Sequence, residues 1–124
     1  MSIEVDRRRA DEIAARIELG PITVRRYFGG VSLVAGKIQF AIVMCGRLYL
    51  RVDDRSRAAL RALGGKPFTY RGQGKAVVVA SYYEAPSAVL DDPNQLTEFA
   101  IQAHRTASAA RRTTAPNLFV HLKQ

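Results

Sequence analysis

Residues 22–54, ITVRRYFGGVSLVAGKIQFAIVMCGRLYLRVDD, decide the fold of this 124-residue chain. They contain four runs of β-branched, aromatic and aliphatic side chains, separated by short turns that each contain glycine. Strands joined by turns this short pair as antiparallel neighbours, because a parallel return needs a long crossover connection. The predicted strands are 22–28, 31–34, 38–45 and 48–52.

Helical patterns lie on both sides of this meander. Before it, apolar residues recur at spacings of three and four residues, and Gly20-Pro21 predicts the end of that helix. After it, Asp53-Asp54 predicts the start of a short helix over 55–63, and Asp92 predicts the start of the last helix. The inward positions predicted for the first and last helices are Ala10, Ile13, Ala14, Ile17, Leu96, Phe99, Ala100 and Ala103.

Two more strands, 67–70 and 75–83, are predicted between the second and the last helix. The order α-β(3-4)-α-β(2)-α predicts an α+β fold, an antiparallel sheet of about five to six strands with helices packed on it. We expect one domain over 1–105 and a basic tail, rich in Ala, Ser, Thr and Arg, over 106–124. The tail either prolongs the last helix or frays, and its apolar end over 118–122 either docks as an extra strand or is loosely ordered.

The net charge of +8 is unevenly distributed along the chain. Residues 21–80 carry eleven basic and two acidic side chains, whereas 81–100 carry four acidic and no basic ones. Such asymmetry is typical of a partner-facing surface, and it also increases solubility. The single cysteine provides no disulfide framework, and no apolar run approaches the ~20 residues of a membrane helix, so we expect a cytoplasmic protein without membrane contact.

No pattern in the sequence predicts catalysis, a metal site or a cofactor. The chain has one cysteine, two histidines and no CxxC or HExxH motif, and its glycine turns match neither phosphate-binding fingerprint. We therefore expect a non-enzyme with no evident small-molecule substrate. Cys45, on the less bulky side of a predicted central strand, is interpreted as a buried, unreactive thiol.

Arginine and tyrosine alternate with apolar residues in two of the predicted strands. Because side chains alternate across a sheet, Arg25, Tyr27, Tyr49 and Arg51 are predicted to share one face, which Tyr83 of the last strand would join. Such a face binds single-stranded nucleic acid, mediates self-association or is merely solvated. The composition of protein interfaces favours self-association among these three uses.

Four stretches, taken in order, resemble the TfoX N-terminal domain family, which is named for bacterial regulators of natural competence, also called Sxy. They are Gly20–Gly30, residues 40–54, Pro67–Tyr70 and residues 81–93. The residues that carry the resemblance are Arg25, Arg26, Phe28, Gly29, Gly30, Pro67, Phe68, Tyr70, Tyr82, Tyr83 and Pro86.

The resemblance implies a secretion-chaperone-like α+β fold, an architecture in which dimers are frequent. It implies a small module of transcription regulation that acts as a homodimer or through a regulatory protein partner. The alternative is a basic nucleic-acid-binding module that uses the Arg/Tyr sheet face, and it rests on the excess of basic residues over 21–80. Full-length regulators carry a second, helical domain that the resemblance does not include. We therefore do not extend their promoter-level coactivation, alongside the cyclic-AMP receptor protein, to this chain.

Overall fold

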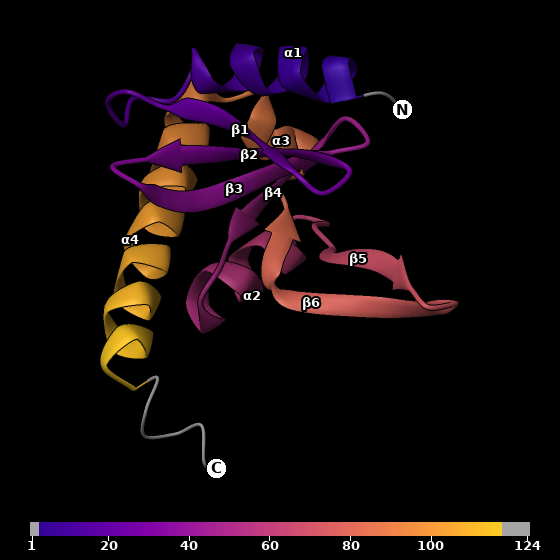
Figure 1. Ribbon diagram of the computed structural model, residues 1–124. Coiled ribbons are helices and arrows are strands. Elements are labelled where there is room, and N and C mark those ends of the chain that lie inside the picture. Colours follow the sequence, from indigo (N-terminus) through magenta and orange to yellow (C-terminus); the bar gives the residue numbers. More distant parts are fainter. Residues whose placement is uncertain (1–2, 118–124) are drawn as a thin grey trace.

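The structure, a computed structural model, describes residues 3–117 (Figure 1). Four helices are present in this range: α1 (Ile3–Ala14), α2 (Asp54–Ala62), α3 (Ser87–Leu90) and α4 (Pro93–Asn117). The strands are β1 (Thr23–Tyr27), β2 (Gly30–Ala35), β3 (Ile38–Met44), β4 (Arg47–Arg51), β5 (Pro67–Gly72) and β6 (Lys75–Glu84). They form one antiparallel sheet in the order β1-β2-β3-β4-β6-β5, which confirms the α+β prediction.

Hairpin turns of two residues connect three of the strand pairs. In each, both central residues have positive φ, as in Cys45 (52°) and Gly46 (76°) between β3 and β4. Two positive φ angles give a turn whose twist matches the twist of the flanking strands. The prediction that Cys45 is buried is wrong, because the strand ends one residue earlier and Cys45 is exposed in this turn.

One β-bulge in β3 decides which side chains enter the main core. Val34 of β2 pairs with Gln39 and Leu33 pairs with Ala41, so Phe40 is an extra residue in β3. Phe40 and Ala41 consequently both pack in the main core, and Ile42 turns to the opposite face of the sheet. Simple alternation places Phe40 and Ile42 on the same side, and the bulge separates them.

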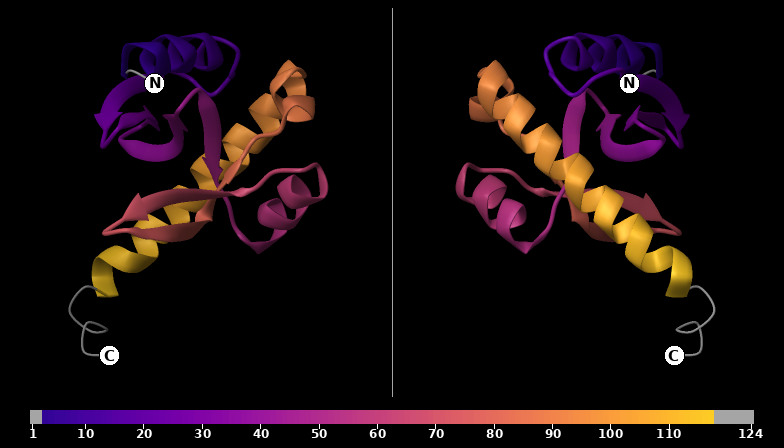
Figure 2. Two further views of the ribbon diagram at one scale, coloured as in Figure 1. Left: turned by 90° about the vertical axis from the view of Figure 1, so that its right-hand side faces the viewer. Right: turned by 90° about the vertical axis from the view of Figure 1, so that its left-hand side faces the viewer.

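The helices cover one face of the sheet. α1 packs on β1 and β2, α4 packs on β3 and β4, and α2 packs on β6. Figure 2 shows α4 running diagonally across the sheet, past the strands of the meander and the β5–β6 hairpin. The buried small residues Ala100, Ala103 and Ala107 allow α4 to lie close to the strands.

The first helix is shorter than predicted, and the last one continues into the tail, which is one of the two predicted alternatives. α1 ends at Ala14, yet Ile17 in the following turn is still buried. α4 continues through position 106 to Asn117, and Arg111 donates a hydrogen bond to the carbonyl of Lys37 at 2.9 Å. The predictions for 118–122 lie outside the described residues. Within the described part, no helix is both long and apolar enough to cross a membrane.

A buried carboxylate connects α1 to the β3–β4 turn. Asp6 is only 1% exposed, and its two oxygens accept hydrogen bonds from the backbone N–H groups of Cys45 (3.2 Å) and Gly46 (2.8 Å). Backbone N–H groups in this turn point away from the strands and would otherwise lack a protein partner. Asp6 therefore holds the central hairpin against the first helix.

We predict that Asp6→Ala lowers the free energy of unfolding by about 2–3 kcal/mol, because two charge-assisted hydrogen bonds are lost at a buried site. Urea unfolding followed by circular dichroism measures this change. Glu4→Ala, at an exposed position of the same helix, is the matched control and should leave the unfolding curve almost unchanged. Equal curves for both variants would show that the Asp6 contacts do not stabilise the fold.

Two neighbouring glycines provide a second matched pair. A Cβ atom added to Gly30 would lie 2.4 Å from the carbonyl oxygen of Val43, whereas one added to Gly29 would meet no atom within 4 Å. We predict that Gly30→Ala destabilises the protein by about 1–3 kcal/mol through this backbone clash. Gly29→Ala should change stability little. The melting temperatures of both variants measure this difference. A Gly30→Ala protein as stable as the natural chain would contradict the close approach of residue 30 to the carbonyl of Val43.

Candidate functional site

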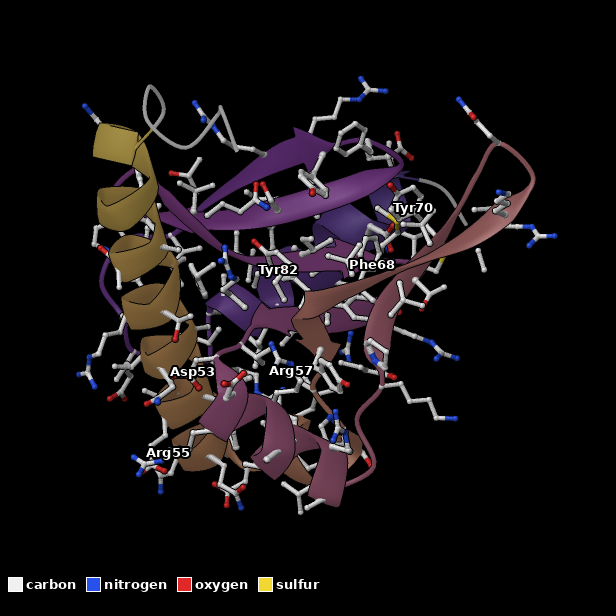
Figure 3. All side chains as sticks on the ribbon, turned by 90° about the horizontal axis from the view of Figure 1, so that it is seen from below. Asp53, Arg55, Arg57, Phe68, Tyr70 and Tyr82 are labelled. Atoms are coloured by element: carbon white, nitrogen blue, oxygen red, sulfur yellow. The ribbon has the colours of Figure 1, made fainter. Side chains whose placement is uncertain are left out.

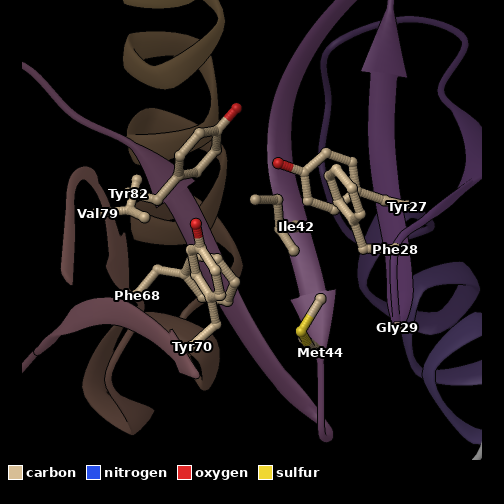
Figure 4. A pocket seen from close by; sticks show the side chains of 9 residues that line it. All are labelled: Tyr27, Phe28, Gly29, Ile42, Met44, Phe68, Tyr70, Val79 and Tyr82. Atoms are coloured by element: carbon tan, nitrogen blue, oxygen red, sulfur yellow. The ribbon is translucent and has the colours of Figure 1, made fainter. Parts of the chain in front are cut away.

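The face of the sheet opposite the helices carries a second apolar cluster. Its buried residues are Ile42, Phe68 and Tyr82, with Tyr27, Met44, Tyr49 and Val79 packed against them. The cluster lines an open pocket of about 440 Å³, which we call the aromatic trough (Figure 4). The trough is lined by Tyr27, Phe28, Gly29, Ile42, Met44, Phe68, Tyr70, Val79 and Tyr82.

The curvature of the sheet forms the trough. Phe68, Tyr70, Val79 and Tyr82 come from β5 and β6 on one side, and the β1 and β3 residues lie opposite them (Figure 4). Register shifts in β2–β3 and in β5–β6 add to the bend of the sheet, as bulges do. The two edge strands of the sheet, β1 and β5, thus contribute to opposite walls of one pocket.

Several rings on this face of the sheet contact each other edge to face. The Tyr27 and Phe28 ring centroids lie 4.8 Å apart at an interplanar angle of 84°, and those of Tyr49 and Phe68 lie 5.0 Å apart at 66°. Such contacts stabilise aromatic pairs beyond their buried area. The outer rings remain accessible, because Phe28 is 84% exposed and Tyr70 is 46% exposed.

Four of the predicted surface residues lie on the trough face. One residue from each of four adjacent strands forms a row across the sheet: Arg25, Ser32, Ile42 and Tyr49. Tyr27 lies two residues after Arg25 on the same strand, so its side chain shares the face of this row. Arg51 pairs across from Tyr82, and its guanidinium carbon lies 5.9 Å from the centre of the Tyr82 ring. The register therefore brings Arg25, Tyr27, Tyr49 and Arg51 to one surface.

Tyr83 does not lie on this surface. It pairs with Leu50, packs in the core on the helix side, and accepts a hydrogen bond from Arg61 of α2 at 3.1 Å. Its neighbour Tyr82 occupies the trough instead. The prediction for Tyr83 is wrong because the strict alternation of side chains breaks within β6. The residues of β6 that face the trough are Val79 and Tyr82, which are three positions apart.

Charged groups on the trough face are mostly basic. Arg25, Arg47 and Arg51 share this face with a single glutamate, Glu84, which lies across from Tyr49 and 3.7 Å from the guanidinium of Arg47. The Nε atom of Arg51 is buried without a hydrogen-bond partner. Burial raises the pKa of the Tyr49 hydroxyl, and the carboxylate of Glu84 adds to this rise.

Three further family-like residues, Arg26, Pro67 and Pro86, lie outside the lining of the trough. Arg26 pairs across from Val31, whose side chain is in the helix-side core, and is itself exposed. Pro67 begins β5, and Pro86 precedes α3 at its N-cap position.

The trough rings are separate from the polar residues at the start of α2. Figure 3 shows the rings of Phe68, Tyr70 and Tyr82 away from the side chains of Asp53, Arg55 and Arg57.

Ile42, Met44 and Val79 are trough residues that sequence reasoning missed. All three are apolar residues of predicted strands, and their pattern is also typical of a buried core. A free apolar face becomes visible only when the positions of the helices are known.

The other candidates for chemistry have structural roles. Asp53 forms the predicted cap of α2: its carboxylate accepts the N–H of Ser56 at 2.8 Å, which lowers the pKa of Asp53 below 3.8. The Gly72–Lys75 segment is the turn of the β5–β6 hairpin. In the described part of the chain, no three His, Cys, Asp or Glu residues are grouped as metal ligands would be.

A sequence model described as the TfoX N-terminal domain matches residues 14–107, which is most of the chain. Among curated proteins, none matches the sequence. The matched family indicates a regulatory module and is not known for enzymes.

The buried hydroxyl of Tyr82 gives a prediction for alkaline pH. Desolvation raises its pKa above 10.0, although a hydrogen bond from Gln39 at 3.2 Å acts in the opposite direction. The unfolded chain then releases this proton at lower pH than the folded one. The contribution of Tyr82 to stability is therefore fully present below pH 10.0 and is lost as pH rises through the folded pKa.

We predict that the free energy of unfolding falls above pH 10.0 and that it falls less steeply in Tyr82→Phe. Urea titrations at a series of alkaline pH values measure both slopes. Parallel slopes for the two proteins would mean that Tyr82 is not the group responsible.

Proposed function

Because the chain belongs to the TfoX N-terminal domain family, we propose that it is a non-enzymatic regulatory module that works by binding protein through the aromatic trough. In this proposal the module takes part in transcription regulation in the bacterial cytoplasm. The observation that supports it most is the open apolar face opposite the helices, where Phe28 and Tyr70 are exposed beside a pocket of about 440 Å³. Apolar patches rimmed by polar residues are typical of protein interaction sites.

The bound protein is either a second copy of the chain or a different regulatory protein. Tyrosine and arginine, which gather on the trough face, are enriched where proteins associate. Light scattering separates the two possibilities. A dimer that dissociates in Tyr70→Ser supports self-association through the trough, and a clean monomer at tens of micromolar leaves the heterologous partner.

A second candidate function is binding of single-stranded nucleic acid. It is favoured by the placement of Arg25, Tyr27, Tyr49 and Arg51 on one face, since bases stack on tyrosine and phosphates pair with arginine. A salt titration with a labelled oligonucleotide tests it. Several phosphate contacts give a steep loss of affinity with salt, and no binding at low salt excludes this function.

The regulatory role predicts a specific effect in the source organism. Deletion of the gene should change a defined set of transcripts, and Tyr70→Ser should reproduce that change at equal protein level, because the ring lines the trough. Val78→Ser is the matched control. Val78 is 60% exposed on the same hairpin but lies outside the trough.

RNA sequencing of the strains measures the outcome. Full restoration of the transcripts by Tyr70→Ser would contradict the proposed use of the trough.

A further inference from the structure

We propose that the aromatic trough receives an extended, acidic segment of a partner protein, which pairs with the free edge of β5 and places alternate aliphatic side chains in the pocket. This builds on the proposed function, since it specifies the chemistry of the protein that the trough binds. Three features of the structure support it: the deep part of the pocket, the unpaired edge and the charge of the face.

The deep part of the trough is shaped for aliphatic groups. Ile42, Met44 and Val79 contribute aliphatic surface beside two pairs of rings: Tyr27 and Phe28, which pack edge to face, and Phe68 and Tyr70, which are tilted by 31° to each other. Branched aliphatic side chains of a peptide fill a space bounded by aliphatic groups and rings well. The pocket volume of about 440 Å³ lies within the usual range of binding pockets.

The edge of β5 offers backbone groups for a further strand. β5 is the last strand of the sheet, and its outer edge pairs with no other strand of the described chain. Phe68 and Tyr70, two residues apart, both line the trough. A peptide paired with this edge would have the same period of two, so its alternate side chains would enter the trough beside these rings.

The opposite edge of the sheet is less available for this purpose. β1 is the other outermost strand, and the Arg7 side chain of α1 donates a hydrogen bond to the carbonyl of Val24 at 3.4 Å. A guanidinium at this position obstructs an incoming strand. The pairing is therefore assigned to β5.

The charge of the trough face favours an acidic segment. Arg25, Arg47 and Arg51 lie on this face, and Glu84 offsets only one of them, through its ion pair with Arg47. Carboxylates that flank the aliphatic residues of the peptide would pair with the two remaining arginines. A protein segment can place its carboxylates opposite Arg25 and Arg51 and a neutral residue near Glu84, whereas a phosphate backbone carries a charge at every step.

Selection from a phage library of random linear peptides tests this proposal. The immobilised full chain is the target, and the selected peptides are then measured by fluorescence anisotropy. We expect the peptides to alternate aliphatic with polar residues and to contain an excess of Asp and Glu. Replacing the acids by Lys, or interrupting the peptide with Pro to remove backbone donors, should each weaken binding about tenfold or more.

Variants of the protein locate the bound peptide. Tyr70→Ser and Phe28→Asn should each weaken binding about tenfold, and Val78→Ser should not. Asn tolerates the positive φ of 49° at Phe28, so this variant keeps the backbone unstrained. Arg25→Gln and Arg51→Gln should weaken binding more at low salt than at high salt, because screening already reduces the attraction at high salt. Circular dichroism confirms that each variant is folded.

Three results would overturn the proposal, and they distinguish its failure from that of the proposed function. Peptides that depend on Tyr70 but tolerate both Lys and Pro replacement would contradict the acidic strand and leave the proposed function standing. Peptides that bind Tyr70→Ser as well as the natural chain, or an oligonucleotide that binds in the trough where no peptide does, would contradict both.

Discussion

The bulge at Phe40 is the constraint on which both faces of the sheet depend. By inserting one residue into β3, it sends Phe40 and Ala41 to the helix side and Ile42 to the other side. Phe40 there contacts His104 of α4, with ring centroids 5.9 Å apart, so the bulge also helps to place the last helix. Without the extra residue, the largest side chain of β3 would lie in the trough and the helix-side core would lose it.

The trough is open because the helices pack on the other face of the sheet. α1, α2 and α4 all pack on the same side, and the described chain provides no element for the other. The sheet partly covers that face itself, by curving until residues of β1 and β5 form opposite walls. The apolar rings that remain exposed are the observation that makes an interaction role physically reasonable, since exposed apolar area of this kind is costly to keep in water.

Most of the fold is readable from the sequence because its signals are local. Glycine turns, β-branched runs and the Asp53 cap each predict an element that is present, and simple alternation places Arg25, Tyr27, Tyr49 and Arg51 on one face. The register of the strands depends on contacts between distant parts of the chain, and the wrong predictions concern register. Because the alternation breaks in β6, Tyr82 takes the place on the trough face that was predicted for Tyr83. Cys45 is exposed because its turn begins one residue earlier than predicted.

The methyl group of Met44 tests directly whether the aromatic trough is the binding surface. The chain has two methionines, and Met44 lines the trough. In a protein labelled with ¹⁵N at its amides and with ¹³C at its methionine methyl groups, addition of a selected acidic peptide should shift the Met44 methyl signal, and the shift should saturate at the concentrations that saturate binding. An unchanged Met44 signal, with shifts confined to amides of α2 and α4 on the helix-covered face, would contradict the trough as the binding surface.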